Sequence, residues 1–167
     1  GCILRFDDLA GYLEDLLLII LPQSTAEETN PHKKPVEYNH ADGGEKLRLV
    51  EATPADLDEV MLRLKKLAPD RVWLGIYMHG RGKDRRRLEE QRARAKQCDV
   101  PILAVNDALY ADVTARPLHD VLTAIRSGVS VDQAGTRLEA NAERYLKSPT
   151  EMTRLFARAP EAIAETA

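Results

Sequence analysis

The sequence has only two cysteines, Cys2 and Cys98, and they lie far apart in the chain. We therefore expect no disulfide framework, and the chain suits a reducing cytoplasm. The most apolar stretch, "DLLLIIL" (Asp15–Leu21), is far shorter than the ~20 residues that a membrane helix needs. No basic segment precedes it, so neither a membrane anchor nor a signal peptide is expected.

An excess of positive charge is also missing. The chain has 24 Lys and Arg against 27 Asp and Glu, a net charge of −3, which argues against a protein that coats nucleic acid by charge alone. GxSxG, P-loop and GxGxxG motifs are absent from the sequence, and no Ser/His/Asp arrangement stands out. What is present, 167 residues of which 44% are hydrophobic and 31% charged, is typical of one soluble globular domain.

Three apolar runs predict β-strands. They are Asp15–Leu21, which we expect to be buried on both faces, Arg71–Tyr77 and Pro101–Val105. The segments between them have helical patterns, so the strands should be parallel and joined by right-handed crossovers. The fold class is therefore α/β.

Four further segments complete the α/β part. Phe6–Tyr12 predicts a short helix, and the polar stretch Ser24–Gly44 predicts a mobile loop over 24–46. Thr53 is a candidate N-cap before Pro54, and the apolar stripe of the helix that follows should pack on the sheet; it consists of Leu57, Val60, Met61 and Leu64. "KDRRRLEEQRARAKQ" predicts a polar helix.

The last third of the chain has a helical pattern. A helix begins near Pro117, and after Gly128 the pattern is helical throughout. "SVDQ" (Ser130–Gln133) and "SPTE" (Ser148–Glu151) each predict a capping box. Because the chain starts without Met and ends inside a helical pattern, we expect it to be a piece of a larger protein.

Two candidate metal ligands follow neighbouring strands. His79 lies just past Arg71–Tyr77, and Asp107 lies just past Pro101–Val105. The carboxyl ends of adjacent parallel strands lie side by side, so the pair could share a metal. A hydrolytic site takes three or more protein ligands, however, and these are two; we expect no bound metal and no catalytic residue.

The remaining histidines and the basic helix can each be interpreted as ordinary surface features or as functional groups. His32 and His40 should face solvent in the polar loop, and His119 should have a surface or capping role. The basic helix is either a solvated face with alternating charges or a nucleic-acid contact made by Arg85, Arg86 and Arg92. No aromatic residues interleave with these arginines, so base stacking is unsupported.

One stretch, "RPLHDVLTAIRSGVSVDQAGTRLEANAERYLKSPTEMTRLF" (Arg116–Phe156), is distinctive. Together with the preceding "PILAVND", it strongly resembles bacterial C-family DNA polymerases, relatives of the polymerase III alpha subunit. The "RPLxDVLTxIRxG", "ANAERxLKSPxEM" and "LF" elements look specifically like the error-prone, damage-inducible branch. The resemblance is close from about Arg71 to Ala167 and loose before that.

The resemblance implies a fold and two domains. In that family this segment is the second half of an N-terminal PHP (polymerase and histidinol phosphatase) domain, a parallel β/α barrel. Residues 1–128 would then be the back part of a PHP-type barrel, and residues 129–167 a helical segment leading toward the polymerase core. The His-x-His strand that begins the family's barrel is not in this sequence.

The resemblance also implies that the metal site has decayed. Relatives with an intact site read "NDVHYH" where this chain has Asn106 to Ala111, so Leu109 and Ala111 stand in place of histidines. Gly75 stands where the family often has an acidic residue. His79 and Asp107 look like remnants.

The function that the resemblance implies is a structural and interaction role inside an error-prone polymerase that supports translesion synthesis. Nucleotidyl transfer would use magnesium held by carboxylates outside this segment. The partners would be the rest of the polymerase chain, DNA through that chain, and other mutasome or replication factors. The alternatives are a metal-dependent phosphoesterase or 3′–5′ exonuclease, and a DNA-contacting module. Because a barrel cut before its first strands leaves an apolar edge unpaired, we also expect the isolated chain to form a homodimer through that edge.

Overall fold

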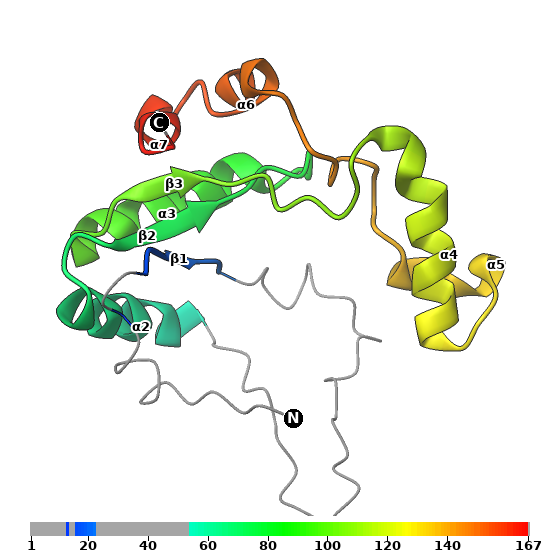
Figure 1. Cartoon of the computed structure of the whole chain (residues 1–167), viewed down its shortest axis with the longest axis horizontal. Helices are drawn as coiled ribbons and strands as arrows, with labels where there is room; N and C mark the ends of the chain where they lie inside the picture. The colour runs from blue at the N-terminus through cyan, green and yellow to red at the C-terminus, as the bar shows by residue number, and fades with distance from the viewer. Residues whose placement is uncertain (1–12, 14–15, 23–53, 167) are drawn as a thin grey trace, which may run out of the picture.

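The computed structural model describes Leu13, residues 16–22 and residues 54–166 (Figure 1). The expected helix Phe6–Tyr12, the loop over 24–46 with His32 and His40, and the Thr53 cap lie outside the described residues. No helix in the described part of the chain is long and apolar enough to span a membrane.

A three-stranded sheet is the centre of the fold, with strand order β1-β2-β3. Leu18 pairs with Val72, and Leu74 pairs with Ile102, both in parallel register. The parallel α/β prediction is therefore confirmed, with strands shorter than the apolar runs: β1 (Leu18–Ile20), β2 (Val72–Ile76) and β3 (Ile102–Ala104).

Helices α2 (Pro54–Leu67) and α3 (Asp84–Cys98) are the crossovers between the strands. The expected α2 stripe is confirmed, since Met61 is fully buried and Leu57 and Leu64 are buried beside it. The side chains that α3 buries recur three or four residues apart, so even this charged helix presents a narrow inner stripe; they are Asp84, Leu88, Gln91, Ala95 and Cys98.

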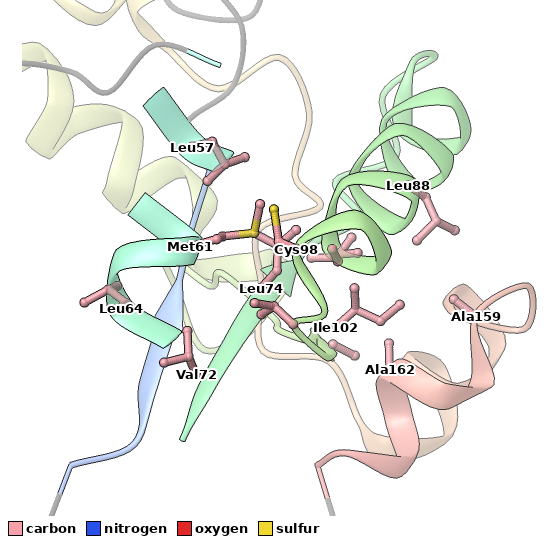
Figure 2. Packing of buried hydrophobic residues seen from close by; sticks show 14 of the residues in the cluster. Leu57, Met61, Leu64, Val72, Leu74, Leu88, Cys98, Ile102, Ala159 and Ala162 are labelled. Atoms are coloured by element: carbon pink, nitrogen blue, oxygen red, sulfur yellow. The ribbon is translucent and has the colours of Figure 1, made fainter. Parts of the chain in front are cut away.

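The hydrophobic core lies between these helices, one face of the sheet and the end of the chain. Figure 2 shows Met61, Leu74 and Ile102 in this cluster, with Ala159 and Ala162 approaching from the C-terminal side. Phe156 is also fully buried. Helix α7 (Pro160–Ala164) packs against β3, so the last residues of the chain complete the core.

Strand β1 departs from the prediction of burial on both faces. Leu18 and Ile20 pack against the core, but Ile19 between them is 48% exposed. Leu17 and Leu21, at either end of the strand, are exposed as well. Burial on both faces requires a second layer, which no described element supplies for this strand.

The last third of the chain is less helical than predicted. Helix α4 (Arg116–Ser127) begins where expected, and α5 (Val131–Ala134), the 3₁₀ turn η3 (Gly135–Arg137) and α6 (Pro149–Leu155) follow. Residues 138–147 form no helix, because their hydrogen-bonding groups pair with other segments.

Only one of the two predicted capping boxes forms. At Ser148 the side chain accepts from the Glu151 amide, and the Glu151 carboxylate accepts from the Ser148 amide. Ser130 makes no side-chain capping hydrogen bond. The Ser130 prediction is therefore wrong, and the helix that follows it is only four residues long.

Candidate functional site

The carboxyl ends of β2 and β3 bring His79 and Asp107 together. His79 Nε2 lies 3.1 Å from Asp107 Oδ2, and the histidine is 3% exposed. The nitrogen makes a close contact but no hydrogen bond of good geometry. Adjacent parallel strands end at the same edge of a sheet, so the two residues meet as their positions in the sequence suggested.

A guanidinium group occupies the other side of Asp107. Arg144 donates from Nη2 to Asp107 Oδ2 at 2.9 Å and from Nε to the Asp107 carbonyl oxygen at 3.2 Å. Burial raises the pKa of the Asp107 carboxyl, but the interactions with His79 and Arg144 outweigh it, and the pKa lies below its ordinary value. The carboxylate is therefore held in its charged form by protein groups.

Arg144 belongs to a longer chain of alternating charges. Its Nη1 lies 3.1 Å from Glu139 Oε1, and the other oxygen of Glu139 lies 2.9 Å from Arg81 Nη2. The Glu139 carbonyl accepts a hydrogen bond from Arg116 at 2.6 Å. We call residues His79, Asp107, Arg144, Glu139 and Arg81 the strand-end charge network.

Backbone hydrogen bonds fasten the segment 138–147 beside the loop after β3. The Leu109 amide donates to the Arg144 carbonyl at 2.8 Å, and the Leu146 amide donates to the Tyr110 carbonyl at 3.1 Å. Asn106 pairs with the backbone of Lys147 in both directions, at 3.2 and 3.3 Å. This pairing is the reason that the segment is not helical.

The loop after β2 is tied to the same segment. The Asn141 side chain donates to the His79 carbonyl at 2.7 Å. Gly80 has φ of 67°, and a Cβ atom there would lie 3.0 Å from Glu143 Cγ. A residue without a side chain therefore allows the turn and the close approach of the segment 138–147.

These residues do not fit a divalent cation. His79 and Asp107 contact each other, and Arg144 places a positive charge against the carboxylate that a metal would need. Among the described residues no group of three or more His, Cys, Asp or Glu side chains is arranged to hold a metal. Leu109 and Ala111 are exposed and supply no ligand atoms.

Apolar side chains from β1 and the residue after it lie close to Gly75. A Cβ atom there would lie 2.6 Å from Leu21 Cδ2 and 2.9 Å from Ile19 Cγ2. Real Cβ atoms essentially never come so close to a neighbour, so a larger residue would require the side chains of β1 to move. An acidic side chain at this position would therefore displace the exposed side chains of Ile19 and Leu21.

Tyr77 forms a stack that sequence reasoning missed. Its ring lies 4.4 Å from the His79 ring, and the Arg87 guanidinium lies 4.4 Å from the Tyr77 ring centroid. Arg87 also pairs with Asp84 at 2.9 Å. Arg87, one of the basic residues of α3, thus interacts within the fold, through a cation–π contact with Tyr77 and an ion pair with Asp84.

The three candidate nucleic-acid contacts lie on α3. Arg85 is exposed, Arg86 Nε lies 2.7 Å from Glu90 Oε1, and Arg92 Nη2 lies 2.7 Å from Glu161 Oε1. The last pair links α3 to α7. Away from this face, the His119 side chain is half-buried and its ring lies 5.7 Å from the Tyr110 ring, so it packs within the fold instead of having the surface or capping role that we expected.

Arg144 and Glu139 are the site residues that sequence reasoning did not single out. Both lie in the stretch that the sequence pattern assigned to helix, where a charged residue indicates a solvated face. For Arg144 the available signal was the "ANAERYLK" motif (residues 140–147), because such a distinctive run within a surface helix needs another explanation; Glu139 lies just before this motif.

The fold and the site define a class of protein: a parallel α/β chain whose strand-end site is closed by its own charged side chains. No family model matches the chain. It is 39% identical over 165 residues to an error-prone DNA polymerase of Bradyrhizobium diazoefficiens, covering 99% of this chain and 12% of that protein. It is 53% identical over 104 residues to an error-prone DNA polymerase of Rhodopseudomonas palustris, covering 62% of this chain and 9% of that protein.

The chain is therefore homologous to a segment of proteins named error-prone DNA polymerase. A third such protein, from Brucella abortus, is 48% identical over 119 residues, covering 68% of this chain and 11% of that protein. The chain spans about a tenth of the length of these relatives.

Proposed function

We propose that the chain is a portion of an error-prone DNA polymerase of the bacterial C-family, induced by DNA damage and acting in translesion synthesis in the cytoplasm. The observation that carries the proposal is similarity over 165 residues, almost the whole chain, to a polymerase so named. Nucleotidyl transfer by the whole protein would use magnesium at carboxylates outside this segment. DNA and other replication or mutasome factors would be partners of the whole protein.

Within that polymerase we propose that residues 1–128 are the back part of a PHP-type β/α barrel. Residues 129–167 would lead toward the polymerase core. Three parallel strands with helical crossovers support this assignment. The segment 138–147 crosses from the second region to the strand ends of the first, so the two regions would share one site.

The role we propose for this segment is structural, with a degenerate metal site. The supporting observation is the contact of Arg144 with Asp107, since a cation already neutralises the carboxylate that a metal would bind. A phosphoesterase or proofreading exonuclease would need open coordination positions and water at this place.

The proposal is tested with the full-length protein that contains this segment. Purified in metal-free buffer, it should extend a primed template, also past an abasic site, when magnesium is added. Asp107→Asn should retain this activity, and hydrolysis of p-nitrophenyl phosphate or of a 3′ end should be the same in both proteins. Failure to extend any primer would refute the polymerase assignment. Hydrolysis lost in Asp107→Asn, or one equivalent of zinc or manganese lost with it, would refute the structural role.

The same protein tests DNA contact by α3. Arg85→Ala, Arg86→Ala and Arg92→Ala should leave the salt dependence of DNA binding unchanged, because Arg86 and Arg92 already pair with carboxylates. A decrease in the slope of log K against log salt would instead assign phosphate contacts to these residues.

A further inference from the structure

Helix α4 carries its large apolar side chains on its outer side. Leu118 is 64% exposed and Ile125 is 68% exposed, and Val121 and Leu122 between them are exposed too. Their spacing of three, four and seven residues places all four on one side of the helix. We call these four residues the α4 stripe.

The inner side of α4 is polar. Arg116 Nε lies 3.4 Å from Asp120 Oδ2, both side chains are largely shielded, and Arg116 also reaches the Glu139 carbonyl. Ala124 is the buried residue of this helix. In the described part of the chain, this amphipathic helix therefore exposes its apolar face and directs its polar face toward the protein.

The surroundings of α4 explain the exposure. Within the described residues it packs on α5 and on the 3₁₀ turn η2 (Val113–Ala115), and Figure 1 shows it standing apart from the sheet. Single exposed apolar residues are ordinary, but four such side chains in a continuous stripe form a patch of the kind that marks an interface.

We propose that the α4 stripe docks against another segment of the same, longer polypeptide. This inference rests on the proposed function, under which the chain is a small part of a polymerase; the relative from Bradyrhizobium diazoefficiens has only 12% of its length covered by this chain. A covalently attached surface is present at an effective concentration of roughly millimolar, which favours it over a second copy of the protein.

The stripe defines the chemistry of its occupant. Anchors spaced at i, i+3, i+4 and i+7 fit an apolar groove or a second helix with aliphatic side chains. Arg126 is exposed one residue beyond Ile125, so a carboxylate of the occupant near it would complete the contact.

Photo-cross-linking in the full-length protein tests this inference. A benzoylphenylalanine replaces Leu122, and in the control it replaces Ser127, which is exposed on the same helix away from the stripe. Leu122→benzoylphenylalanine should cross-link to an apolar segment of the same molecule outside residues 1–167, and the Ser127 control should not. A cross-linked dimer, a cross-link confined to residues 1–167, or equal behaviour at both positions would overturn the inference.

A second measurement does not depend on the bulky probe. Ile125→Cys should react with a maleimide several-fold more slowly than Ser127→Cys in the folded full-length protein, and at an equal rate after denaturation. Equal rates in the folded protein would overturn the inference. Primer extension by the same preparations keeps the two proposals separate: an active polymerase whose Ile125→Cys thiol reacts freely refutes the docking alone.

Discussion

At the scale of single residues, Asp107 shows how a positively charged side chain, that of Arg144, can occupy the position beside a carboxylate where a metal ion would bind. The carboxylate contacts a buried histidine on one side and a guanidinium on the other, at 3.1 and 2.9 Å. Its backbone is left-handed, with φ of 48°, which turns the loop after β3 toward Arg144. The loop is therefore held by charge and backbone geometry together.

Arg144→Ala should destabilise the chain by about 1–3 kcal/mol, because it leaves the part-buried Asp107 and Glu139 without their shared cation. Arg144→Lys should recover part of the loss, since an ammonium keeps the charge but lacks the fork that reaches both carboxylates. Urea unfolding measures the change, with exposed Arg85→Ala as the control, expected within about 0.5 kcal/mol of the parent. Equal losses at Arg144 and Arg85 would contradict this account.

Asp107→Asn should remove a pH-dependent part of the stability. The folded pKa of Asp107 is lowered, so its charge contributes fully above the unfolded value of ~3.9 and is lost as the pH falls through the folded value. The difference in unfolding free energy between parent and variant should be largest near neutral pH and shrink in acid. Asn adopts the left-handed conformation readily, so the backbone is unaffected. A difference that stays constant from neutral pH to about pH 3 would be the contrary result.

At the scale of elements, the two capping sequences show that a local motif is not sufficient to form a cap. "SPTE" begins α6, and its serine and glutamate bond reciprocally. "SVDQ" begins α5, which is only four residues long, and its serine makes no side-chain cap. A capping box forms only where tertiary packing of the helix stabilises its first turn.

Ser148→Ala should cost about 1 kcal/mol of unfolding free energy, because it removes the acceptor for the Glu151 amide. The matched change Ser130→Ala should cost only a few tenths of that amount, because no side-chain bond is lost. Thermal unfolding of the two variants side by side measures the contrast. Similar losses in both would show that the cap at Ser148 does not stabilise the fold.

At the scale of the whole molecule, the sheet has one covered and one bare edge. Helix α7 packs on β3, whereas β1 contains the exposed Ile19, lies between the exposed Leu17 and Leu21, and has no strand beyond it among the described residues. An unpaired, apolar strand edge is a template for another chain.

The 167-residue chain by itself should therefore associate as a two-fold dimer through β1. Light scattering at micromolar concentration should give about twice 18.7 kDa, and Ile19→Lys should shift the mass to that of the monomer. Leu118→Lys, on the α4 stripe, is the control and should leave the dimer intact. A monomeric parent, or a dimer broken only by the control, would refute association through β1.

The amino-acid sequence by itself determined the three strands, the two crossover helices between them and the start of α4. Apolar runs and helical stripes, such as that of α2, are local signals. Where strands and helices alternate along the chain, the strands usually pair in parallel. The sequence also determined that His79 and Asp107 would follow neighbouring strands. Only the tertiary structure decided what meets them, because Arg144 lies 37 residues beyond Asp107 and no local pattern records that pairing. Tertiary contacts likewise kept residues 138–147 from forming a helix. They left the α4 stripe and one side of β1 exposed, since burial depends on what a face packs against and not only on its own residues.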